Sequence, residues 1–431
     1  MQRRVYSKDT GQTLIMFVLF MLTLVAFVGL GIDLGFAYIT RARLSKAVDA
    51  ACLAGIRSYS STAVAQATDI AKSAFQANYG TSGRDAVSPY PPKVLFDASG
   101  PNITLDVNAT ATINTFFIRV LPALFPGGPS WQTLTVGSHA QATRPNLIMS
   151  IVLDRSGSMG PVDQGGDGGM DALKATVPVF INHFDDVLDR ASMISFSYAA
   201  TVGFPMGRPF KDAITTAVNA LTPVGWTASE QGLLKGWQQN ESVTPQGDEK
   251  IVRVIVFFTD GLANTWQPSD LFKCGTIMRT NNVGPDLSLY DPVTGAGVSG
   301  CSFPSCLHSI NPPYGCVSTT KNCDQGSGHN NVASGMYNEA EARAEYWAQQ
   351  ARLQGNVVYA IGLGDPNGAK ECGRSPINPV FLQTVANDPN GPNFVGDGSQ
   401  PQGIALIANS ADELPQIFEQ IASAILARLT R

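Results

Sequence analysis

LIMSIVL, residues 147–153, runs directly into DRSGSM, residues 154–159, and this junction decides the fold of the larger part of the chain. An unbroken apolar run of this length is typical of a strand that is buried on both faces of a parallel sheet. The Ser, Gly and Asp residues that end it favour a turn. The junction therefore predicts a strand of an α/β domain with carboxyl and hydroxyl groups at its carboxyl end.

Strand and helix patterns alternate outward from this junction. The residues from Met170 to Leu188 place apolar side chains on one helical face. Further strands are expected at 191–198, 201–205, 251–259 and 356–362, and further helices near 211–221, 228–239, 337–354 and 411–428. Such alternation predicts an α/β fold with a doubly wound, mostly parallel sheet over about residues 145–430. In such sheets, ligands bind beyond the carboxyl ends of the strands.

Five oxygen-bearing side chains are expected at those strand ends. Asp154, Ser156 and Ser158 follow the first strand, Asp260 follows the strand at 251–259, and Thr227 opens a helix. Carboxylate and hydroxyl oxygens suit Mg²⁺, with Mn²⁺ or Ca²⁺ as alternatives. Two carboxylates do not fill the six-oxygen shell of Mg²⁺. One position therefore stays open for water or for a carboxylate from a partner.

This pattern closely resembles the von Willebrand factor A domain and its metal-ion-dependent adhesion site, in which D-x-S-x-S precedes a Thr and then an Asp. The resemblance covers about residues 146–430, apart from one insertion. It implies that Ser156, Ser158 and Thr227 bind the ion through hydroxyls, and that Asp154 and Asp260 bind it directly or through water. It also implies a protein partner that supplies an Asp or Glu. The alternative is a degenerate site that holds only water.

Two neighbouring features leave alternatives open. Asp163, Asp167 and Asp171 lie in a Gly-rich stretch, where they suit a second cation or, for Asp167 or Asp171, a helix N-cap.

An insertion at about 265–335 carries five cysteines, and Cys372 makes six outside the N-terminal helix. Disulfides are expected among these six, with fifteen pairings possible. Zinc held by Cys301, Cys306, Cys316, Cys323, His308 and His329 is the alternative, but the spacings do not match the usual pairs.

The N-terminal part contains an uncharged apolar run. Residues 14–32 (LIMFVLFMLTLVAFVGLGI) are long enough to cross the hydrocarbon core of a bilayer as a helix, and longer than the apolar region of a signal peptide. The helical pattern continues to about residue 57, which predicts a helix that protrudes from the membrane. Basic residues flank both ends, so charge does not fix the orientation. The clustered cysteines favour an oxidising compartment, and therefore residues 1–13 in the cytoplasm and the bulk of the chain outside it.

The order of short motifs here resembles the N-terminal region of TadG-like proteins of the tight-adherence (Flp/Tad) pilus system. Gly11-Gln12-Thr13 precedes the apolar run, and three motifs follow it: Gly31-Ile32-Asp33-Leu34-Gly35, Arg41-Ala42-Arg43-Leu44 and Ala47-Val48-Asp49-Ala50-Ala51. The resemblance covers about residues 10–57. It implies a bacterial inner-membrane protein that works with other pilus assembly or pilin-like subunits. Residues 12–16 lack the glutamate that accompanies prepilin cleavage, so processing at Gly11 is not implied.

Residues 58–144 are expected to form a small pilin-like or stalk module. Residues 80–100 are rich in Gly, Pro, Ser and Asp and suggest a linker. Residues 103–114 alternate apolar and polar side chains, which predicts a half-buried strand, and 131–143 suggest a second strand. Between them, 116–125 suggest a short helix. A β module resting on the protruding helix and a plain stalk both fit this pattern.

Composition excludes some function classes. The net charge is −5, so the chain has no basic excess for binding nucleic acid. No G-x-x-x-x-G-K-[ST] phosphate loop and no nucleophile–base set occurs, so no catalytic residues and no enzyme are expected. The sequence therefore predicts a membrane-anchored, envelope-exposed protein of Tad-type pilus assembly or adhesion. Two alternatives are a pilin-like subunit whose A domain is only a spacer, and a regulatory subunit of a cytoplasmic ATPase.

Overall fold

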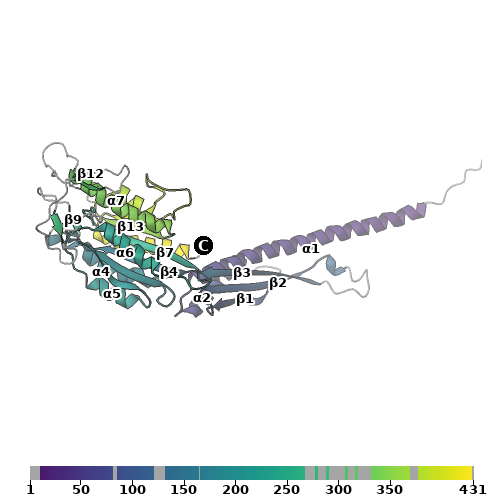
Figure 1. Cartoon of the computed structure of the whole chain (residues 1–431). Helices are drawn as coiled ribbons and strands as arrows, with labels where there is room; N and C mark the ends of the chain where they lie inside the picture. The colour runs from purple at the N-terminus through teal and green to yellow at the C-terminus, as the bar shows by residue number, and fades with distance from the viewer. Residues whose placement is uncertain are drawn as a thin grey trace, which may run out of the picture. The chain divides into compact units, whose positions relative to one another are not determined.

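A computed structural model describes residues 10–80, 85–120, 132–164, 166–266, 277–279, 288–290, 306–308, 316–318, 332–368 and 377–429 (Figure 1). The chain divides into two compact units, Met1–Arg144 and Pro145–Leu429.

The first unit begins with α1 (Thr10–Arg57), an unbroken helix of 48 residues. At 1.5 Å per residue its length is about 72 Å. The helix is long and apolar enough to cross a membrane, and its apolar side chains from Leu14 to Ile39 are mostly exposed. The predicted long helix is therefore confirmed. Beyond Asp33, one face becomes buried at Ala37, Thr40, Leu44, Ala47, Val48, Ala51 and Cys52.

A second helix and a sheet pack on that buried face. Helix α2 (Val64–Tyr79) lies against α1, and the strands β1 (Asp85–Asp97), β2 (Ile103–Asn114) and β3 (Thr133–Arg144) form an antiparallel sheet in the order β1-β2-β3. The odd-numbered residues of β2 from Ile103 to Ile113 are buried, as the alternation predicted. Cys52 is a free, buried thiol that donates to the carbonyl oxygen of Leu105 at 3.4 Å.

The expected linker at residues 80–100 is wrong. Residues 85–97 form β1, which pairs with β2. The three prolines in this stretch argued against a strand, because proline has no backbone N–H to donate to a neighbouring strand. They are accommodated because β1 is an edge strand and its register shifts between Ser88 and Lys93, so that Pro89, Pro91 and Pro92 fall outside the pairing. Helix α2 is a second element that the sequence did not predict.

The second unit is built on a six-stranded sheet of order β14-β13-β7-β4-β5-β6. All neighbouring pairs are parallel except β5 and β6, which are antiparallel. The strands are β4 (Asn146–Asp154), β5 (Arg190–Phe196), β6 (Ala200–Gly207), β7 (Ile251–Thr259), β13 (Val357–Leu363) and β14 (Ile404–Ala408). The predicted α/β, mostly parallel fold is therefore confirmed.

Helices cover both faces of this sheet. Side chains of α4 (Gly169–Asn182), α5 (Lys211–Asn219) and α9 (Leu414–Arg428) join one buried apolar cluster. Side chains of α6 (Ser229–Glu241), α7 (Val332–Leu353) and α8 (Pro379–Ala386) join the other. The sheet is thus covered on both sides, and its strands β4 and β13 are buried along their whole length.

Two further elements were not predicted, and the insertion is described only in part. Strand β14 is short and half-exposed. Helix α8 has only eight residues. Asn378 caps this helix, so the Asn378-Pro379 pair could have indicated where it begins. The described strands of the insertion are β8 (Thr265–Trp266), β9 (Ile277–Arg279), β10 (Ser288–Tyr290), β11 (Cys306–His308) and β12 (Cys316–Ser318), and α7 begins within its last residues. The expected disulfides, and the zinc alternative, lie outside the described side chains and stay predictions.

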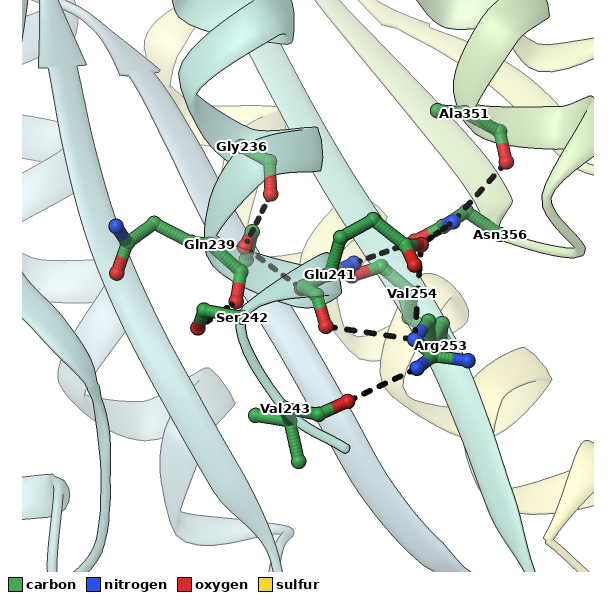
Figure 2. A network of polar contacts seen from close by, with 11 residues as sticks. Gly236, Gln239, Glu241, Ser242, Val243, Arg253, Val254, Ala351 and Asn356 are labelled. Atoms are coloured by element: carbon green, nitrogen blue, oxygen red, sulfur yellow. Dashed lines mark hydrogen bonds and ion pairs between the residues drawn. The ribbon is translucent and has the colours of Figure 1, made fainter. Parts of the chain in front are cut away.

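A buried polar network holds the C-terminal end of α6 against the sheet (Figure 2). Asn240 donates through Nδ2 to the Val254 carbonyl oxygen at 2.9 Å and to Asn356 Oδ1 at 2.8 Å. The hydroxyl oxygen of Ser150 lies 2.7 Å from Asn240 Oδ1. Asn356 in turn donates to Glu241 Oε1 and to the Ala351 carbonyl oxygen, both at 3.0 Å. One asparagine therefore ties α6 to β4, β7 and the residue just before β13.

We expect Asn240→Ala to lower the free energy of unfolding by about 1–3 kcal/mol, because it leaves buried polar partners unsatisfied. The measurement is urea denaturation of the full chain in detergent. Asn219→Ala is the matched control, since Asn219 is the exposed last residue of α5; we expect it to change stability by no more than about 0.5 kcal/mol. Equal losses in the two variants would contradict the role of the network.

Candidate metal centre

The pairing of β4 with β7 places two acidic strand ends side by side. Leu153 and Phe258 are register partners in these parallel strands, so Asp154 and Thr259 follow next to each other. The Thr259 hydroxyl donates to Asp154 Oδ2 at 2.6 Å, and the Ser156 backbone N–H donates to Asp154 Oδ1 at 2.8 Å. Asp154 is completely buried. Its carboxylate is therefore held in one orientation at the carboxyl edge of the sheet.

The loop after β4 brings the two serines to Asp260. Ser156 Oγ lies 3.0 Å from Ser158 Oγ and donates to Asp260 Oδ1 at 3.2 Å. Neighbouring backbone fixes the loop, because Arg155 N–H donates to the Phe196 carbonyl at 2.9 Å and Gly157 N–H donates to the Gly225 carbonyl at 3.1 Å.

Gly225 makes this contact possible. Its φ is 78°, a left-handed conformation that favours glycine, and a Cβ there would lie 2.7 Å from the ring of Tyr198. The chain therefore turns tightly beside the serine loop just before it reaches Thr227.

Thr227 joins the same cluster from the start of α6. Its backbone N–H donates to Asn264 Oδ1 at 2.9 Å, and the Asn264 N–H donates back to the Thr227 carbonyl at 3.3 Å. Gly261 leaves a space beside it: a Cβ built on that glycine would lie 3.8 Å from both Ser158 Oγ and Thr227 Oγ1. The hydroxyls of Ser158 and Thr227 therefore face one small region next to Asp260. Ser158 is exposed, so that region opens to solvent.

The carboxyl groups in this cluster repel one another. Burial raises the pKa of Asp154 to about 6, although hydrogen bonds from Thr259 and Ser156 oppose the rise. Burial, and then repulsion from Asp154 and Asp167, raises the pKa of Asp260 well above its ordinary value. Burial also raises the pKa of Asp167. Ionising all three carboxyl groups together is therefore unfavourable unless a positive charge is bound among them.

One oxygen of Asp260 is left without a partner. Asp260 Oδ2 is buried and accepts no hydrogen bond within the described part of the chain. A buried, unpaired carboxylate oxygen is costly, and a bound cation is one way to compensate it. In the ranges that the structure describes, no group of three or more His, Cys, Asp or Glu side chains could hold a metal ion. Any ion here would therefore depend on the serine and threonine hydroxyls as ligands.

The five residues proposed from the sequence thus lie in one cluster, and three further residues support it. Thr259 orients Asp154, Asn264 holds the backbone of Thr227, and Asp167 adds negative charge. Thr259 could have been found from its place at the end of β7, whereas Asn264 had no local signal. Asp167 Oδ1 accepts from the Gly169 N–H at 2.8 Å at the start of α4, while Gly168 is the N-cap residue. Asp163 and Asp171 are exposed.

Family models match both units. Residues 11–67 match the Tad family model, described as Flp pilus-assembly TadE/G-like. Residues 149–262 match the model of the von Willebrand factor type A domain. The second match contains all five clustered residues. No curated protein matches the chain.

Solved structures with a similar fold include domains of pilus proteins. The vWF domain of the type V pili tip protein Mfa5 from Porphyromonas gingivalis is 14% identical, with a TM-score of 0.42 over 67% of this chain and 97% of that one. The PilB minor pilin from Streptococcus sanguinis is 15% identical, with a TM-score of 0.43 over 81% and 80%. Proximal thread matrix protein 1 from the mussel byssus, with a zinc-occupied MIDAS motif, is 15% identical, with a TM-score of 0.35 over 66% and 46%.

At these identities and TM-scores the solved structures add no argument about function, and the assignment rests on the strand order and the two family models. The chain therefore joins an N-terminal segment of the TadE/G-like Flp pilus-assembly family to a von Willebrand factor type A domain.

Proposed function

We propose that Asp154, Ser156, Ser158, Thr227 and Asp260 hold a divalent cation, most readily Mg²⁺, through which the type A domain binds an Asp or Glu of a protein partner. The observation that carries this proposal is the buried, unpartnered Oδ2 of Asp260 beside the hydroxyls that surround Gly261. A cation at this place would compensate the repulsion among the carboxylates and use each hydroxyl as a ligand.

The ligand types support Mg²⁺, with Mn²⁺ and Ca²⁺ as alternatives. Every candidate ligand is a carboxylate or hydroxyl oxygen, and none is a thiol or an imidazole. A bound ion of this class supplies a positive centre that attracts an anionic oxygen. The serine and threonine hydroxyls bring no charge, so the ion keeps some of its attraction for an anionic oxygen of a partner. The exposed position of Ser158 leaves the approach open to a partner.

The proposed place of this activity is the bacterial envelope. The TadE/G-like match and the apolar helix support anchoring through residues 14–32 in the inner membrane. The cysteines between Cys274 and Cys323 favour a C-terminal domain outside the cytoplasm. The partners we propose are other pilus assembly or pilin-like subunits, or surface ligands in adhesion, that present an acidic side chain. The family and fold belong to structural and adhesive proteins of pili rather than to enzymes.

The direct test is Asp154→Asn, which keeps the side-chain shape but removes its charge. We expect the variant to lose Mg²⁺ binding in calorimetry of the full chain in detergent, and to lose pilus assembly or adhesion in cells. Asp163→Asn is the matched control, because Asp163 is exposed and lies nearby in sequence. It is expected to bind Mg²⁺ like the unchanged protein.

Two results would contradict the proposal. If Asp154→Asn binds Mg²⁺ as well as the control does, these residues do not form a metal site. If the variant loses Mg²⁺ binding but pili, adhesion and partner binding are unchanged, the domain acts as a spacer.

Thr259→Val tests the positioning of Asp154, since it removes the 2.6 Å hydrogen bond to Oδ2 and keeps the side-chain size. Partners that orient metal ligands typically contribute 10–100-fold to affinity, so we expect Mg²⁺ to bind about 10–100-fold more weakly. Thr201→Val, at an exposed position of β6, is the control. Equal Mg²⁺ affinities in the two variants would show that Thr259 does not position the site.

A further inference from the structure

Asp33 is the first charged residue after the apolar run, and it is buried by its own unit. Its side chain is 4% exposed. Oδ1 accepts the backbone N–H of Phe116 at 3.0 Å, and Oδ2 accepts those of Phe117 at 2.9 Å and Ile118 at 2.8 Å. Three charge-assisted bonds therefore tie the segment after β2 to one point on α1. They also satisfy three N–H groups that would be costly to leave unpaired near a membrane.

Phe117 is held against Gly29, which belongs to the apolar run itself. A Cβ on Gly29 would lie 2.5 Å from the Cβ of Phe117, so only glycine permits this contact. Gly29 precedes Ile32, the end of the run, by three residues, which is about 4.5 Å of helix. A side chain that touches Gly29 therefore lies at the depth of the last turn of the run, and not beyond it.

The two phenylalanines are exposed although they are apolar. Phe116 is 41% and Phe117 is 42% exposed, whereas the neighbouring Ile118 is buried. Phe116 also lies near Phe36 of α1, with ring centroids 6.3 Å apart. Exposed apolar side chains of α1, among them Ile32 and Leu34, lie in the same stretch of the helix. Apolar surface thus continues from the helix onto the segment after β2.

We propose that Phe116 and Phe117, here called the aromatic tip, insert into the headgroup–acyl boundary of the phospholipid leaflet on the C-terminal side of the span. This inference rests on the membrane anchoring of residues 14–32 in the proposed function. The depth of Gly29 selects the lipid as occupant, because the tip contacts the very turn that the bilayer surrounds. Aromatic side chains are enriched at this boundary. The β module then contacts the membrane at a second place besides the helix.

The test replaces single residues with the photo-cross-linker p-benzoylphenylalanine in the full chain, reconstituted in phosphatidylethanolamine–phosphatidylglycerol vesicles. Phe117 and Phe116 are replaced in separate variants, so that one variant remains if the other misfolds. Phe20, exposed within the run, is the control for anchoring.

Leu95 is the negative control, because it is an exposed apolar residue of the same sheet. It lies next to Phe96, which pairs with Leu105, and Leu105 contacts Gly55. Gly55 lies 26 residues (55 − 29) beyond Gly29, which is about 39 Å along α1.

Mass spectrometry after irradiation measures adducts of one phospholipid. We expect adducts at positions 20, 116 and 117 and none at 95. Adducts at 20 but at neither tip position would overturn the inference and leave the anchor intact. Cross-links from the tip to a second protein chain would overturn it in favour of a protein contact. Adducts at 95 as well would overturn the inference, because the contact with lipid would then not be specific to the tip. No adduct at 20 would remove the anchor and the tip together.

Discussion

Repulsion among buried carboxyl groups is the constraint around which the carboxyl edge of the second unit is organised. Parallel pairing of β4 and β7 brings Asp154 and Asp260 close together, and Asp167 adds a third carboxyl group. Hydrogen bonds from Thr259, Ser156 and the backbone compensate only part of this charge. The remaining imbalance, with one oxygen of Asp260 unpaired, is what distinguishes this edge from an ordinary cluster of turns. It is also the physical reason to expect a cation there.

Hydrogen bonds near both ends of α6 hold this helix against neighbouring segments. The helix starts two residues after Thr227, and its other end is tied to β4, β7 and Asn356 by Asn240. Asn264 holds the backbone of Thr227, and the hydroxyls of Thr227 and Ser158 both border the space beside Gly261.

Much of this arrangement could be predicted from the sequence, and the failures have two causes. The strand at 147–153 and the D-x-S-x-S motif were visible because an apolar run and its polar end are local signals. Thr227 and Asp260 followed from the family pattern. Strand β1 was missed because Pro89, Pro91 and Pro92 conceal an edge strand whose register skips them. The ties made by Asn264 and Asp33 join residues far apart in the chain, so no spacing rule reveals them.

The two family matches lie in an N-terminal unit with a long apolar helix and in a domain with a candidate site, and each unit contains a buried carboxylate. Asp33 is satisfied by three backbone donors, whereas Asp260 is not fully satisfied. The central claim is that a bound cation compensates the unpaired oxygen of Asp260. Diffraction from crystals grown with Mn²⁺ tests this claim most directly. We predict an anomalous peak bounded by Ser156, Ser158 and Thr227, next to Asp260. Well-ordered density for these side chains with no peak between them, or with the peak elsewhere, would contradict the claim.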